Sequence, residues 1–154
     1  MNAALHAWKR FEGLPFGKAL FSRFVCWKAP YFASISPRFE ELRPGFARVS
    51  MRKRRAVTNH IGTVHAIAMC NLAELAAGTM TEVSIPASMR WLPKAMQVDY
   101  VKKSSGGVRA TATLPDVIDG PARDVPASVE IKDDLGEVVC RATITMWVSP
   151  RKRS

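Results

Sequence analysis

Residues 64–78 read VHAIAMCNLAELAAG and predict the longest helix of the chain. Apolar side chains recur there at the three- and four-residue spacing of one helical face. The segment is also rich in alanine, so other elements could enclose this thin helix closely. Gly78 is the predicted C-terminal stop. The apolar face consists of Val64, Ile67, Ala68, Leu72, Leu75 and Ala76.

The segments on both sides of this helix are predicted to be strands. Residues 31–55 are expected to be extended, and after the turn at Pro44-Gly45 the run ARVSMR (47–52) alternates apolar and basic or polar residues. Everything after residue 88 indicates antiparallel sheet, with turns at 104–107 (SSGG) and 133–136 (DDLG). Alternating segments there are 96–100, 108–114, 129–132 and 140–148.

This order of strand, strand, long helix and then a meander of three or four strands predicts an α+β fold. One helix cannot cover such a sheet from outside unless the antiparallel sheet curls around it. At 154 residues the chain has room for one such domain, which we assign to residues 31–149. Residues 1–30 are predicted to be an N-terminal helical extension, and residues 150–154 a basic C-terminal tail.

The N-terminal extension is predicted to contain an amphipathic helix closed by Pro30. The favoured interpretation is a helix packed on the outside of the domain. A lid, or a helix in contact with a membrane surface, is the less favoured alternative. The extension combines aromatic and basic residues: Trp8, Phe11, Phe16, Phe21, Phe24 and Trp27 beside Lys9, Arg10, Lys18 and Arg23.

The formal net charge of +10 indicates attraction to a polyanion, whether nucleic acid, an anionic membrane or a phosphorylated cofactor. A basic surface without an anionic partner is the fourth possibility. Basic residues are dense at Arg48 and Arg52–Arg55 and again at 151–153, whereas seven of the thirteen acids lie between Asp116 and Glu137.

Several protein classes are disfavoured. No apolar run approaches the roughly 18–20 residues that span a bilayer, and the N-terminus MNAALHAWKR does not resemble a secretory signal. The three cysteines show no CxxC spacing, so a reduced cytoplasmic protein without disulfides or zinc is expected. His60 and His65 are poorly spaced for a metal, and Cys70 does not share a helical face with His65 as a nucleophile pair would.

The run NHIGTVHA (59–66), with Glu74 fifteen residues after Asn59, carries a family resemblance. It resembles the motif N-x-x-G-x-x-H-G-G of hotdog-fold acyl-CoA thioesterases of the phenylacetyl-CoA thioesterase and thioesterase superfamily member 2 type, in which an aspartate follows at the same distance. With LRPG (42–45) and MQVDYVKK (96–103), the chain is similar to the DUF4442 branch of that superfamily over roughly residues 31–149. The resemblance implies a hotdog fold, a curled sheet around one central helix.

The resemblance also implies roles for individual residues. Asn59 would position water or substrate, and His65 would lie near the thioester sulfur. Ala66 replaces the glycine whose N–H polarises the thioester carbonyl, and Glu74 replaces the acid that activates water or attacks. The implied protein is an acyl-CoA hydrolase that needs no cofactor or metal and forms a homodimer or homotetramer, with Asn59 and His65 of one subunit facing Glu74 of another. Two departures are the Ala66-Ile67 pair in place of two glycines and Glu in place of Asp.

The residues support this chemistry independently. If Thr63 caps the helix, the N–H groups of His65 and Ala66 are free to stabilise an oxyanion, and Gly62 eases the turn before them. Glu74 lies at the margin of the apolar face, where partial desolvation would raise its pKa toward that of a usable base. The phosphates of coenzyme A are expected on Lys102, Lys103 and Arg109, or on Arg52–Arg55.

Other functions remain open at this stage. A non-catalytic acyl-CoA-binding or interaction module would keep the fold and lose turnover, and the Ala66-Ile67 departure favours it. Hydroxyacyl dehydratases on hotdog folds resemble H-F-P-x-x-P-G before the helix, and no proline lies between Arg55 and Glu74. Specific nucleic-acid binding is not expected, because no aromatic residue interleaves with the basic run 52–55.

Overall fold

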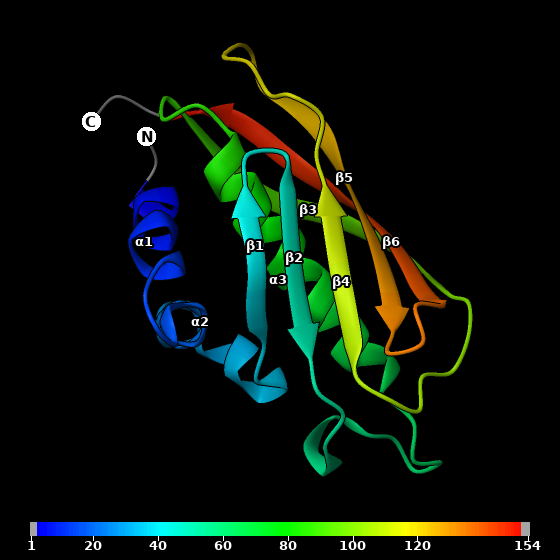
Figure 1. The fold of residues 1–154 in the computed structure, drawn as a ribbon. Coiled ribbons are helices and arrows are strands. Elements are labelled where there is room, and N and C mark those ends of the chain that lie inside the picture. Colours follow the sequence, from blue (N-terminus) through cyan, green and yellow to red (C-terminus); the bar gives the residue numbers. More distant parts are fainter. Residues whose placement is uncertain (1–2, 152–154) are drawn as a thin grey trace.

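The computed structural model describes residues 3–151, in which an antiparallel sheet of six strands curls around one long helix, α3 (Ala66–Ser84) (Figure 1). The α+β architecture predicted from the sequence is confirmed. Within the predicted basic tail, Pro150 is the last residue of the final strand, and positions 152–154 lie outside the described residues.

The strands do not follow one another across the sheet as a simple meander. Their spatial order is β1-β2-β4-β5-β6-β3, so β3 follows the helix in the chain but pairs with β6 at the far edge. Alternation predicts that a segment is a strand but carries no information about its neighbour, which is why this crossover was missed. The strands are β1 (Arg38–Arg43), β2 (Phe46–Met51), β3 (Met89–Tyr100), β4 (Val108–Thr113), β5 (Arg123–Asp133) and β6 (Val138–Pro150).

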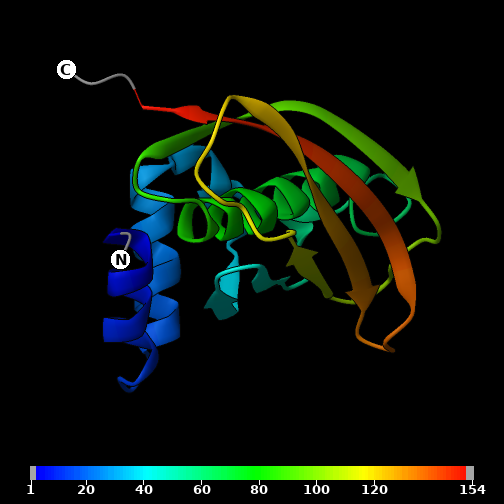
Figure 2. The ribbon, with the colours of Figure 1, turned by 90° about the horizontal axis from the view of Figure 1, so that it is seen from above.

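The core lies between α3 and the concave face of the sheet, and Figure 2 shows the sheet arching over the helix. Small residues face each other on both layers, so the backbones approach closely. Ala73, Ala76 and Ala77 of α3 are fully buried, as are Ala47 of β2 and Ala110 of β4. The alanine-rich composition of residues 64–78 therefore reflects enclosure by the sheet.

The predicted stop at Gly78 is wrong, because α3 continues to Ser84. Gly78 instead provides room for Trp91 of β3: a Cβ at this position would lie 2.9 Å from the indole ring. The helix ends where Ile85 becomes extended before Pro86, as residues that precede proline usually do.

The N-terminal extension is helical and shares the core of the domain. It comprises α1 (Ala3–Glu12) and α2 (Gly17–Lys28). A 3-10 helix, η1 (Pro30–Ile35), follows, although extended chain was predicted from residue 31. Trp8 and Phe21 are buried with Phe39 of β1, and the Phe21 ring meets each of the other two rings edge-on at a centroid distance of 5.1 Å. Within residues 3–151, no helix has both the length and the apolar character required to cross a membrane.

Candidate functional site

The turn that leads into α3 is organised by the side chain of Asn59. Its Oδ1 accepts hydrogen bonds from the N–H groups of Ile61 and Thr63, at 3.2 and 3.0 Å, and its Nδ2 donates to Thr63 Oγ1 at 2.8 Å. Gly62 has φ of 76°, a left-handed conformation that glycine adopts without steric cost. Asn59 thus holds the turn in shape, and the second hydrogen on Nδ2 remains for a ligand.

His65 caps α3, and the prediction that Thr63 does so is wrong. The His65 Nδ1 accepts a hydrogen bond from the N–H of Ile67 at 3.0 Å, so the proton of the neutral ring lies on the exposed Nε2 side. The His65 N–H, predicted to be free, donates to the carbonyl of Val57 at 2.8 Å. Sequence reasoning failed here because the hydroxyl of Thr63 is already bound by Asn59.

Among the backbone N–H groups of Gly62, His65 and Ala66, that of Ala66 is free to bind a substrate oxygen. It is the first residue of α3, and its backbone N–H has no hydrogen-bond partner in the described part of the chain. The Gly62 N–H, in contrast, donates to the carbonyl of Asn59 at 3.1 Å. A free N–H at a helix N-terminus, together with the helix dipole, favours negative charge on a nearby oxygen.

Glu74 is exposed on a helix whose neighbouring residues Ala73 and Leu75 are buried. Its carboxylate takes part in no ion pair or hydrogen bond with any residue between 3 and 151. The sequence predicted partial desolvation at this position, and in a single subunit the side chain is instead open to solvent. Desolvation of Glu74 would therefore require a second molecule.

The α3 residues one turn on either side of Glu74 contact β3. One turn before it, Cys70 Sγ lies 3.0 Å from Tyr100 Oη, and this hydrogen bond, followed by burial, raises the pKa of Tyr100 to about 12. One turn after it, Gly78 packs under Trp91. Exposed apolar residues continue this surface on both elements. We call Ile67, Glu74, Met96 and Tyr100 the α3–β3 surface.

The structure does not bring the three predicted catalytic residues together in one subunit. Asn59, His65 and Ala66 gather at the N-terminus of α3. Glu74 lies nine residues beyond His65, or about 13 Å along the helix axis at 1.5 Å per residue. Glu74 therefore lies apart from the other predicted site residues in the single subunit.

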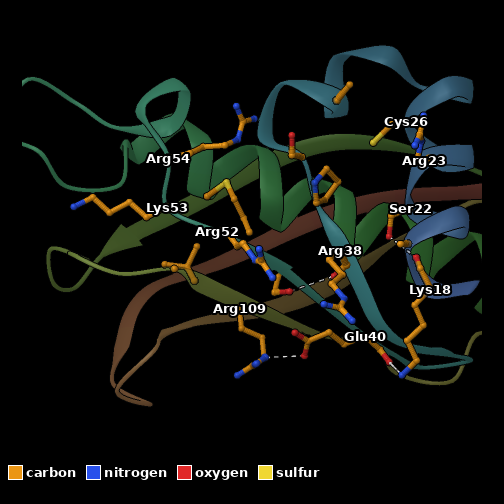
Figure 3. Close-up of a pocket in the computed structure, with 18 of the residues that line it drawn as sticks. Lys18, Ser22, Arg23, Cys26, Arg38, Glu40, Arg52, Lys53, Arg54 and Arg109 are labelled. Carbon is orange, nitrogen blue, oxygen red and sulfur yellow. Dashed lines mark hydrogen bonds and ion pairs between the residues drawn. The ribbon is translucent and has the colours of Figure 1, made fainter. Parts of the chain in front are cut away.

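A wide hollow lies elsewhere, between α2, β1, the end of β2 and the turn at 105–107, with a volume of about 1320 Å³ (Figure 3). We call this hollow the cationic groove because seven cations line it: Lys18, Arg23, Arg38, Arg52, Lys53, Arg54 and Arg109. Three acids also line it: Glu12, Glu40 and Asp134.

Most cations of the groove are electrostatically uncompensated. Arg109 alone among the seven forms an ion pair within residues 3–151, with Glu40 at 2.7 Å. Partial burial acts to raise the pKa of Glu40, but hydrogen bonds from Arg109 and Ser50 and the nearby positive charges outweigh it and hold the pKa below its usual value. Glu40 is therefore charged at neutral pH and already satisfied by Arg109.

The cations predicted for coenzyme A are distributed differently from the prediction. Lys102 is paired with Glu137, and Arg109 with Glu40. Lys103 is exposed outside the cationic groove. The alternative segment, Arg52–Arg55, places three of its four side chains in the groove.

A partly buried polar cluster that sequence reasoning missed connects this groove to α3. Ser34 accepts a hydrogen bond from Arg54 through its carbonyl, and its hydroxyl accepts one from Asn71 Nδ2 at 3.2 Å. Arg54 Nε and Asn71 Oδ1 are buried without a partner in the described chain, so the cluster has capacity for a water molecule or a ligand. An asparagine among the apolar residues of the helix, three positions before Glu74, was the available signal.

A family model matches most of the chain. The model of a domain of unknown function (DUF4442) matches residues 17–148. No curated protein matches the chain. Among residues 3–151, no group of three or more His, Cys, Asp or Glu side chains could hold a metal ion.

Several solved structures are similar to this chain in three dimensions. A crystal structure from a structural-genomics programme, whose name states no activity, is 46% identical with a TM-score of 0.84, over 96% of this chain and 99% of that one. A Pseudomonas aeruginosa protein named a probable thioesterase is 22% identical, with a TM-score of 0.75 over 90% and 97% of the two chains. A Haemophilus influenzae thioesterase is 12% identical, with a TM-score of 0.69 over 78% and 82%. The expected hotdog fold is confirmed.

Proposed function

The chain belongs to the DUF4442 family, and from this premise we propose that it hydrolyses an acyl-CoA thioester to a free acid and coenzyme A. One observation carries the proposal: Glu74 is a solvent-exposed carboxylate between buried residues of the central helix, in a fold whose named neighbours are thioesterases. A carboxylate at that place can act on a substrate, whereas its structural value to the helix is small. The reaction requires no cofactor beyond the coenzyme A of the substrate.

In the proposed mechanism, Glu74 takes a proton from a water molecule, and the resulting hydroxide attacks the thioester carbonyl carbon. The carbonyl oxygen becomes an oxyanion that the Ala66 N–H and the dipole of α3 stabilise. The C–S bond then breaks, and the coenzyme A thiolate takes the proton from Glu74. Asn59 would orient the water or the carbonyl through its remaining Nδ2 hydrogen, with His65 Nε2 close to the sulfur.

A homodimer would complete this site, because one subunit keeps Glu74 far from His65. The unpaired edge of β3 and the α3–β3 surface are the faces available for pairing. Pro93 has no N–H and a bulge follows it, so edge pairing is expected over Met96–Tyr100. A partner covering this surface would also desolvate Glu74 and raise its pKa toward that of an effective base.

Charges on that edge are therefore expected to abolish assembly. The double substitution Met96→Asp and Val101→Asp places like charges within the proposed edge pairing and directly after it, so size-exclusion chromatography with light scattering should report a single-chain mass, and hydrolysis should be lost with it. The matched control is Ile118→Asp with Leu135→Asp, which adds the same charge at two exposed apolar residues elsewhere. A single-chain mass for the wild type at micromolar concentration would contradict the shared site.

We further propose that the phosphates of coenzyme A bind to Arg52 and Lys53 at the end of the cationic groove. Neither side chain has a carboxylate partner in the described chain, so both can meet an anion without losing an existing ion pair. The adjacent Arg54 reaches α3 through Ser34 and Asn71, which supports a path from this end of the groove toward the central helix.

Arg52→Gln with Lys53→Gln is expected to raise KM for acyl-CoA roughly two- to tenfold, with kcat little changed. This is the effect expected when one or two exposed ion pairs with the phosphates are lost. Wild-type KM should also rise with added salt because exposed charges are screened. Lys132→Gln with Arg141→Gln, which removes the same charge from β5 and β6, is the control and should leave KM unchanged. A KM indifferent to both salt and the groove substitution would remove the groove from the substrate site.

The direct test of the proposed activity is a screen of acyl-CoA chain lengths with detection of the free thiol. Release of thiol at a rate proportional to protein concentration supports hydrolysis. Saturable binding of acyl-CoA without thiol release would instead identify the non-catalytic binding module.

A further inference from the structure

Helix α2 exposes one apolar side to solvent although its opposite side is part of the core. Phe21 and Ser22 are buried against β1, whereas Phe16 is 86% exposed, Trp27 73% and Tyr31 71%. Five exposed apolar residues between positions 16 and 31 follow one another at intervals of four, four, three and four residues, so those within the helix lie on one face. We call Phe16, Leu20, Phe24, Trp27 and Tyr31 the apolar stripe.

Cations without carboxylate partners border the apolar stripe. Arg23 and Lys28 flank it along α2, and neither forms an ion pair in the described chain. The Lys28 Nζ lies 5.0 Å from the centre of the Trp27 ring, and Phe16 lines the cationic groove together with Arg23. Exposed Trp and Tyr side chains beside basic residues are typical of a helix that lies in the interface of a membrane.

The position of the stripe in the fold leaves it free in the proposed dimer. Helix α2 packs beside β1, at one edge of the sheet, and β3 forms the opposite edge (Figures 1 and 2). A second copy is also a poor occupant of the stripe, because pairing two of these faces would bring the uncompensated cations of both chains together.

We propose that the apolar stripe docks on an anionic lipid bilayer. Its aromatic side chains enter the headgroup layer, and Arg23 and Lys28 meet the lipid phosphates. The remaining charge of the groove adds to the positive potential on this side of the molecule. Docking is independent of hydrolysis, so the two proposals can fail separately.

The test is flotation of the full chain with vesicles of phosphatidylcholine alone or mixed with phosphatidylglycerol. The protein is expected to float with the anionic vesicles, to remain below with the neutral ones, and to be released by salt. Trp27→Ser with Tyr31→Ser is expected to lower the partition coefficient at least about tenfold, since two interfacial aromatic rings are removed. Arg23→Gln with Lys28→Gln should reduce binding to anionic vesicles by a similar factor.

Ile118→Ser with Leu135→Ser is the matched control, because these residues are 75% and 84% exposed and lie outside the stripe. It should float like the wild type, and urea unfolding should show that every variant is folded. Wild-type protein that stays unbound with anionic vesicles would overturn the proposal. So would a Trp27/Tyr31 variant that floats normally, or one that changes the oligomeric state, since a second copy would then cover the stripe.

Discussion

Turnover of the best acyl-CoA substrate is expected to fall by a factor of roughly 10² or more when Glu74 is replaced by glutamine. The substitution keeps the size and hydrogen bonding of the side chain and removes its capacity to accept a proton from water. Because Glu74 is exposed and unpaired in the single subunit, the change should leave the fold intact. Steady-state hydrolysis by folded, dimeric protein is the measurement, and KM should change little.

Three variants sharpen this result. Glu74→Asp shortens the reach by one methylene and should retain part of the activity. Asn59→Ala should slow turnover less than Glu74→Gln, since solvent can partly replace its positioning role, but it also removes the bonds that shape the turn, so its stability must be measured beside its rate. Co-expressing Glu74→Gln with an Asn59 variant should recover activity in mixed dimers, where one shared site keeps both native residues. If Glu74→Gln turns over at the wild-type rate, the binding-module interpretation becomes the better one.

The second large effect is expected for Phe21→Ala, which should lower the free energy of unfolding by about 3–5 kcal/mol. Phe21 is fully buried and lies edge-on between the rings of Trp8 and Phe39, so its removal leaves a cavity where the extension meets β1. Urea unfolding followed by circular dichroism gives the change from the shift in midpoint.

Phe24→Ala on the same helix is the matched control, because this ring is partly exposed on the apolar stripe. It should cost less than about 1 kcal/mol. A single unfolding transition is expected for both variants, since the extension and the sheet share one core. Similar small costs for Phe21→Ala and Phe24→Ala would show that the extension contributes little to the stability of the domain.

The candidate site was predictable in composition and not in geometry. Its residue types and spacing were visible in the sequence, and the N-terminus of α3 does hold Asn59, His65 and Ala66 together. The capping residue was not visible, because Thr63 and His65 are both polar and only the bond from Asn59 to Thr63 decides between them. The exposure of Glu74 was missed for a similar reason, since helical periodicity gives the direction of a side chain but not what covers it.

What the sequence alone determined was the central helix, most of the strands and the class of fold, since periodicity and turn residues are local properties of the chain. The small residues of 64–78 allowed close enclosure of the helix, and the order of the elements predicted that the sheet curls around it. The tertiary structure decided which strands are neighbours, that Gly78 accommodates Trp91 instead of ending the helix, and that scattered cations from α2, β1, the segment after β2 and β4 line one groove. These features depend on contacts between residues distant in the chain, and no local pattern records them.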